Sequence, residues 1–127
     1  MILKSIYKPV PMTAEQAFLF YSHPANLEAL MPEQIVEWEC DGSSFRFLIK
    51  GMGHVRLVIG ENVQYSKVVY RPEGKMPFAF ELQFLIEEKD FMCQVQVAID
   101  ADLSNPLMAM LAQNPLQNLV NEMAVRL

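Results

Sequence analysis

Apolar and polar residues alternate with a period of two along most of the chain from residue 35 to residue 101, a pattern that predicts β-strands. Most of the alternating segments end at turn-forming residues, of which Asp41-Gly42 is the strongest hairpin signal. Neighbouring strands are therefore expected to pair in antiparallel hairpins. The predicted strands are residues 35–40, 45–50, 54–59, 66–71, 78–87 and 91–101.

The residues before this region predict one strand and two short helices. Residues 2–8 are rich in β-formers, and Pro9 and Pro11 then end the strand. Thr13 and Gln16 have the spacing of a capping box, which predicts a helix over residues 14–21. A second short helix is expected from His23-Pro24 to the residue before Pro32.

Residues 104–127 predict an amphipathic helix. Ser104 or Asn105 can cap its start, with Pro106 at the first helical position. Asn114-Pro115 repeats this signal nine residues later, so a kink or a restart is expected there. Beyond it, one face carries an apolar stripe with helical spacing. The stripe consists of Leu116, Leu119, Val120, Met123 and Leu127.

The order of these elements resembles the helix-grip fold of the START-like superfamily, also called SRPBCC, which includes polyketide cyclases, lipid-transfer domains and the birch-pollen-allergen group. The resemblance covers the whole chain, and its most recognisable segment is KPVPMTAEQAFLFYSHPANLEALMP. It implies an α+β domain over residues 1–127. A seven-stranded antiparallel curved sheet, in the order β-α-α-β6-α, would wrap around the long C-terminal helix.

One departure limits what the resemblance implies about ligands. Proteins of the allergen group carry a glycine-rich loop between their second and third strands, whereas this chain has the tight Asp41-Gly42 turn. The ligand preferences of that group are therefore not transferred. An antiparallel sheet with one polar face must still bury its other face, and the helices are the elements available to cover it.

Composition excludes several classes of protein. The 127 residues are 52% hydrophobic and 20% charged, which favours a folded domain with a sizeable core. A net charge of −5 disfavours nucleic-acid binding. No apolar run approaches the roughly 18 residues of a membrane span, and the N-terminal residues lack a signal-peptide pattern. We expect a cytoplasmic protein without membrane insertion. Cys40 and Cys93 are expected to be small buried apolar residues.

The basic residues of the predicted strands fall on the polar face of the sheet. They are Arg46, Lys50, Arg56, Lys67 and Arg71. Acidic residues on the same face are expected to pair with them, and a two-residue turn at Asp41-Gly42 would place Glu37 opposite Arg46. An alternative use of the basic stripe is to bind an acidic protein partner.

The opposite face is predicted to gather aromatic side chains against the C-terminal helix. The predicted ligand-binding residues are Trp38, Phe45, Phe47, Tyr70, Phe80, Phe84, Leu116, Leu119 and Met123. They line either a pocket for an apolar molecule or a close-packed core, and residue types alone do not decide between the two. Tyr70, Ser66 and the Trp38 indole are the polar groups expected to point inward.

Catalytic residues have little support in the sequence. His23 and His54 lie at no spacing that suggests a metal site or a catalytic triad, and we expect no metal and no cofactor. Most carboxylates alternate outward. The candidates for proton transfer are Tyr70 and Glu61, and a bend at Gly60 would turn Glu61 inward. A buried carboxylate has a raised pKa, which suits it to proton transfer.

We therefore predict a non-catalytic domain that binds or carries a hydrophobic small molecule or lipid-like ligand between the sheet and the C-terminal helix. The first alternative is a polyketide cyclase-like or dehydratase-like enzyme that uses the same pocket. The second is a protein-interaction module with a filled core.

Overall fold

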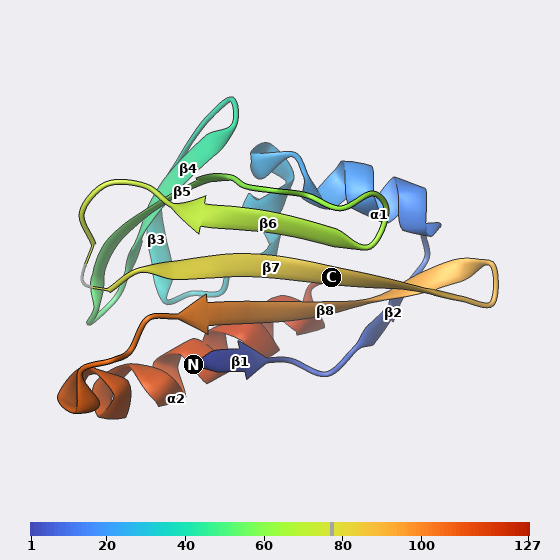
Figure 1. Cartoon of the computed structure of the whole chain (residues 1–127). Helices are drawn as coiled ribbons and strands as arrows, with labels where there is room; N and C mark the ends of the chain where they lie inside the picture. The colour runs from blue at the N-terminus through green and yellow to red at the C-terminus, as the bar shows by residue number, and fades with distance from the viewer. Residues whose placement is uncertain (77) are drawn as a thin grey trace.

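The computed structural model describes residues 1–76 and 78–127, and it contains one eight-stranded antiparallel sheet (Figure 1). Strands follow the order β1-β8-β7-β6-β5-β4-β3 across the sheet, and β2 also pairs with β8. The strands are β1 (Ile2–Lys4), β2 (Lys8–Val10), β3 (Ile35–Asp41), β4 (Ser44–Ile49), β5 (Gly53–Ile59), β6 (Lys67–Pro72), β7 (Phe80–Lys89) and β8 (Met92–Ala101). The helices are α1 (Ala14–Tyr21), the 3-10 helix η1 (Pro24–Leu30) and α2 (Pro106–Val125).

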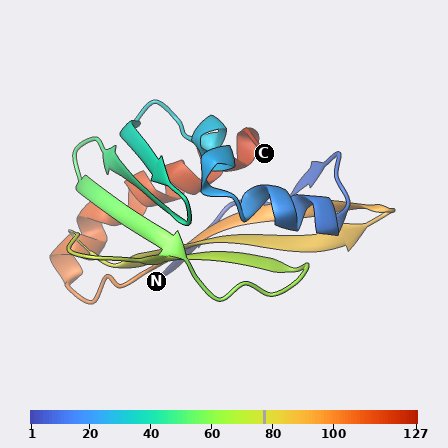
Figure 2. The same ribbon diagram turned by 90° about the horizontal axis from the view of Figure 1, so that it is seen from above.

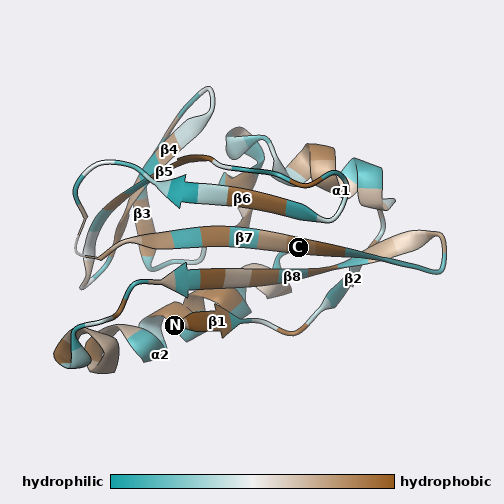
Figure 3. Cartoon of the chain, viewed as in Figure 1, coloured by the Kyte–Doolittle hydropathy of each residue, from teal (hydrophilic) through white to brown (hydrophobic). Residues whose placement is uncertain are grey.

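The sheet curves around the helical side of the molecule (Figures 1 and 2). Helix α2 packs on β8 and β1 and contacts η1, while α1 packs on β6, β7 and β8. The hydropathy colouring shows brown and teal segments alternating along the central strands (Figure 3). Among the described residues, no helix is both long and apolar enough to cross a membrane.

The two short helices are confirmed. The Thr13 hydroxyl accepts a hydrogen bond from the Gln16 N–H at 3.1 Å, and the Gln16 side chain accepts one from the Thr13 N–H at 3.0 Å. This capping box satisfies two of the N–H groups that lack a partner in the first turn, so α1 begins where the sequence predicts. Pro24 begins η1, which is a 3-10 helix.

The first predicted strand is divided into β1 and β2. Both pair with β8, and β2 continues through Pro9 to Val10. Between them, the Ser5 N–H donates to the Val97 carbonyl at 2.9 Å, and the Ser5 hydroxyl accepts from the Val97 N–H at 3.0 Å. Ser5 thereby keeps the chain attached to β8 where the strand is interrupted.

The predicted pairing of Glu37 with Arg46 is wrong. Asp41 pairs with Ser44, so the turn is formed by residues 42 and 43, and Arg46 lies opposite Glu39. The register shifts between Val36 and Glu39, and Glu37 has a φ of 56°. This irregularity is a β-bulge on the edge strand, and such a bulge twists an edge away from pairing with other chains.

Two other expectations are corrected. Cys93 is buried as expected, but Cys40 is exposed, because it lies near the end of the edge strand β3. Helix α2 does not restart at Asn114-Pro115 but continues through Pro115, which is exposed. Water can therefore hydrate the Leu111 carbonyl, which the missing Pro115 N–H leaves without its helical partner. Asn105 caps α2 by accepting from the Leu107 N–H at 2.9 Å.

The β7–β8 hairpin ends in a two-residue turn with an unfavourable backbone conformation. Asp90 and Phe91 have φ values of 51° and 69°, and the Phe91 side chain is 100% exposed. A residue with a Cβ costs about 1–2 kcal/mol in this left-handed backbone conformation. Substitution by glycine regains only part of this energy, because glycine also gives the unfolded chain more conformational freedom. We expect Phe91→Gly to raise the free energy of unfolding of the monomer by about 0.5–1 kcal/mol, measured by urea denaturation of dilute protein.

A matched substitution separates the backbone from the ring. Phe91→Ala removes the ring but keeps a Cβ at the same φ, so its stability should stay within about 0.5 kcal/mol of the unchanged chain. A Phe91→Gly variant no more stable than Phe91→Ala would show that the turn is not strained.

Candidate ligand-binding site

The structure places the predicted ligand-binding residues in the interior between the sheet and the helices. Trp38 is partly buried. The others are almost completely buried: Phe45 at 1% exposure, Phe47 at 2%, Tyr70 at 0%, Phe80 at 2%, Phe84 at 0%, Leu116 at 0%, Leu119 at 3% and Met123 at 1%. Strands β3, β4, β6 and β7 and the second half of α2 supply these side chains.

The aromatic rings in this interior contact one another. The Trp38 ring stacks on Phe45 at a centroid distance of 4.9 Å and lies 6.0 Å from the Phe47 ring. Phe45 meets Tyr70 edge to face at 5.1 Å. Further along, Phe84 is stacked on Tyr21 of α1 at 5.0 Å with an interplanar angle of 5°. These side chains fill the space beside one another, as in an ordinary protein core.

Tyr70 has its polar atom engaged within this core. Its hydroxyl donates to the carbonyl oxygen of Tyr21 at 2.6 Å, across the junction between β6 and the end of α1. Burial raises the pKa of Tyr70 well above its usual value of 10, and a smaller Coulombic effect of Cys40 adds to it. Tyr70 therefore remains protonated near neutral pH and holds α1 against the sheet. Ser66, also predicted to point inward, is exposed.

Glu61 lies outside this interior. Its side chain is exposed instead of turned inward, and it lines a surface pocket with Lys67, Arg71 and Glu81. Gly60 does allow a close approach, since a Cβ built on it would lie 3.1 Å from Cγ1 of Val69. The bend thus brings the backbones of β5 and β6 together without directing Glu61 inward. Among the described residues, no group of three potential metal ligands is present.

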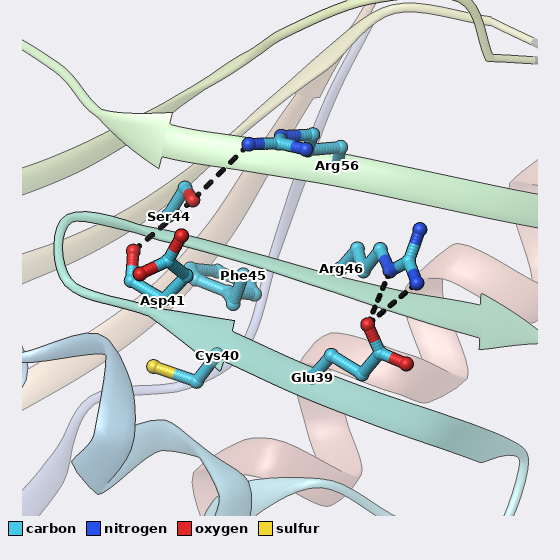
Figure 4. A pocket seen from close by; sticks show the side chains of 7 residues that line it. All are labelled: Glu39, Cys40, Asp41, Ser44, Phe45, Arg46 and Arg56. Atoms are coloured by element: carbon cyan, nitrogen blue, oxygen red, sulfur yellow. Dashed lines mark hydrogen bonds and ion pairs between the residues drawn. The ribbon is translucent and has the colours of Figure 1, made fainter.

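A polar pocket of about 170 Å³ lies beside the β3–β4 turn (Figure 4). Three of the four charged side chains in its lining, those of Glu39, Arg46 and Arg56, are paired. Both Nε and Nη2 of Arg46 contact Oε2 of Glu39, at 2.7 and 2.6 Å, and Nε of Arg56 lies 3.1 Å from Oε1 of Glu73. Because these groups are partly exposed and already paired, the pocket is a hydrated part of the outer face.

An apolar crevice opens between the sheet and the first half of α2. Its volume is about 320 Å³. It is lined by Lys50, Gly51 and Met52 of the β4–β5 turn, by Phe78, and by Met108, Leu111, Ala112 and Pro115 of α2. The turn forms one wall and the helix the other. The crevice therefore lies where a curved sheet meets a terminal helix, next to the Pro115 position that the sequence marks.

The first half of α2 exposes apolar side chains beside this crevice. Leu111, which lines the crevice, is 63% exposed, and Met110 next to it is 73% exposed. The second half carries most of the buried residues of the helix, from Leu116 to Ala124. Exposed apolar side chains that gather at one place on a surface commonly mark a binding site.

Comparison with known proteins identifies the fold. The family models and the curated protein sequences contain no match to this chain. A START superfamily protein from Mycobacterium smegmatis superposes with a TM-score of 0.66 at 15% identity, over 98% of this chain and 95% of that one. Norcoclaurine synthase from Thalictrum flavum, a point mutant in complex with a transition-state analogue, gives a TM-score of 0.68 at 7% identity, over 98% and 94% of the two chains.

The Aha1 dimer from Colwellia psychrerythraea gives a TM-score of 0.56 at 15% identity, over 98% of this chain and 97% of that one. At these identities the likeness concerns the fold. The chain has the START-like helix-grip fold: a curved antiparallel sheet around a long C-terminal helix. The fold that the sequence predicts is confirmed.

Proposed function

We propose that this protein binds a small hydrophobic or lipid-like molecule, without catalysing a reaction, in the crevice between the β4–β5 turn and the first half of α2. The observation that carries the proposal is the crevice itself: an apolar opening of about 320 Å³ between the sheet and the C-terminal helix. Ligand pockets in proteins span roughly 300–1,000 Å³ with mostly apolar linings.

The lining defines the kind of ligand. Met52 and Met108 are flexible and polarisable, so they adapt to ligands of different shape. Lys50 is the one charged residue of the lining. A compact apolar body with a neutral or weakly anionic polar end therefore matches the crevice. Deep contacts with the buried aromatic residues predicted from the sequence stay a prediction, since those rings contact one another in the structure.

Two exposed leucines on the same half of α2 provide a matched test. Leu111 lines the crevice, whereas Leu107 is equally exposed and is not part of the lining. We expect Leu111→Gln to weaken binding of the fluorescent apolar probe 1-anilinonaphthalene-8-sulfonate about tenfold, because a buried leucine contributes about 1.5 kcal/mol. Leu107→Gln should leave the affinity within about twofold. The measurement is a fluorescence titration of each variant.

The natural ligand is sought by native mass spectrometry of the protein from its own host, followed by organic extraction of what accompanies it. A hydrophobic compound that displaces the probe from the unchanged chain but not from Leu111→Gln supports the proposal. Equal affinities of the two leucine variants for the probe, together with a protein that carries no compound, would rule the crevice out as a binding site.

A further inference from the structure

Phe91 is a feature that the monomer does not explain. Its side chain is 100% exposed at the tip of the β7–β8 hairpin, and its φ of 69° is unfavourable for a residue with a side chain. Met92, beside it, is 52% exposed. Neither packing nor backbone geometry favours phenylalanine at this position. An exposed aromatic side chain on a strained turn is typical of a contact made with another molecule.

The charges around Phe91 are mainly acidic. Glu87, Glu88 and Asp90 are exposed at the end of the hairpin, and Lys89 is the basic residue among them. In Figure 3 one limb of this end is teal and the other is pale brown. A surface that receives Phe91 should therefore combine an apolar depression with a basic group at its edge.

The same molecule carries such a depression. A mostly apolar groove of about 520 Å³ lies between residues 5–9, which form the β1–β2 connection and the start of β2, and the end of α2. Ile6 and Val125, 81% and 71% exposed, form part of it. Lys8 is the one charged residue of its lining. Arg126 follows Val125 in the chain, and the groove shares no lining residue with the crevice proposed above.

The tip and the groove lie at the same end of the molecule. Pro9 of the groove pairs with Gln94 of β8, and Phe91 is three residues further along the hairpin. At 3.4 Å per residue this separation is about 10 Å. Figure 1 shows β2 beside the base of the hairpin. A protruding side chain and a groove on the same surface patch allow a twofold-symmetric contact, because each copy can insert its Phe91 into the groove of the other.

We infer that two copies of this chain form a twofold dimer in which Phe91 of each copy inserts into the groove of the other. The acidic hairpin end of one copy then lies against Lys8 of its partner. Two equivalent contacts form, one for each Phe91, and the assembly closes at two copies. The inference is independent of the ligand proposed for the crevice.

Sedimentation velocity of the full chain over about 1 μM to 1 mM tests the inference. We expect a dimer whose dissociation constant rises at least about 30-fold in Phe91→Ser, because truncation of a central anchor residue has an effect of that size. Val63→Ser, a comparable change at a side chain that is 53% exposed on the β5–β6 connection, should leave the dissociation constant unchanged. Circular dichroism checks that each variant is folded.

A mixture of two defective variants gives the decisive result. The Phe91→Ser variant keeps an intact groove but lacks the inserting phenylalanine. The Val125→Asp variant keeps Phe91 but puts a carboxylate in the groove, where it repels the acidic hairpin end of the other copy. Each variant alone should be monomeric, whereas the mixture should form a heterodimer through its one intact contact.

Several outcomes would overturn the inference. They are a chain that stays monomeric at all concentrations, a dimer that is unaffected by Phe91→Ser, and growth beyond two copies. Two variants that do not associate when mixed would also overturn it. So would a monomer that binds phosphatidylcholine vesicles through Phe91, because the partner of the tip would then be a lipid surface.

Discussion

The Phe84→Ala variant is expected to lose about 3–5 kcal/mol of unfolding free energy, the largest effect of a single substitution that we predict for this chain. Phe84 is 0% exposed and its ring is stacked on Tyr21 at 5.0 Å and meets Tyr70 edge to face at 6.5 Å. Its removal leaves a cavity where the sheet meets α1. Since domains are stable by about 5–15 kcal/mol, urea denaturation should show a much earlier transition.

Phe91→Ala is the matched control, because it is the same chemical change at a ring that is fully exposed in the monomer. In dilute protein, where the chain is monomeric, it should alter stability by less than about 0.5 kcal/mol. A loss below about 1 kcal/mol for Phe84→Ala would contradict the close-packed interior. In that case the interior near Phe84 would be hollow, which is the arrangement that the sequence left open as a deep ligand pocket.

Local signals in the sequence predict the elements of this fold well. The capping box of Thr13 and Gln16 places α1 at its observed start, and the cap at Asn105 with Pro106 places the start of α2. These signals depend on hydrogen bonds within a few residues, so they hold whatever the rest of the chain does.

Pairing between strands is predicted less well, because it depends on partners that the sequence does not show. Asp41-Gly42 predicts a hairpin but not the bulge at Glu37, which changes the partner of Arg46 from Glu37 to Glu39. The exposure of Cys40 has a related cause. Alternation places this residue on the inner face, but the position of β3 at the sheet edge is decided by the order of all the strands.

The binding site is the least predictable part. Period-two alternation identifies the inner face, and the aromatic residues found on it are buried as predicted, but alternation does not show whether their rings fill the space. The crevice residues Met108, Leu111, Ala112 and Pro115 are missing from the prediction. The sequence does contain a pattern that could have identified these residues. They are separated by three, one and three positions, a helical spacing that places them on one apolar face of the first half of α2.

The Tyr70→Phe variant is expected to lose about 1–3 kcal/mol, since it removes a single atom that satisfies a buried group. The last carbonyls of a helix have no partner within it, and the Tyr70 hydroxyl donates to that of Tyr21, the final residue of α1, at 2.6 Å. Phenylalanine fits the same space but leaves this carbonyl unpaired. Tyr65→Phe, at a ring that is 40% exposed, should cost less than about 0.5 kcal/mol at neutral pH.

Alkaline pH gives this prediction a second readout. Burial raises the pKa of Tyr21 to about 12 and raises that of Tyr70 as well, so both hold their protons to higher pH in the folded chain than in the unfolded chain. Their contribution to stability is complete below pH 10, the usual tyrosine value, and is lost as the pH rises above it through the folded-state pKa values. Urea transitions measured upward from pH 9 should therefore show a decline that is smaller in Tyr70→Phe than in the unchanged chain. An identical decline in both, with equal stability at neutral pH, would mean that the Tyr70 hydroxyl does not hold α1 to the sheet.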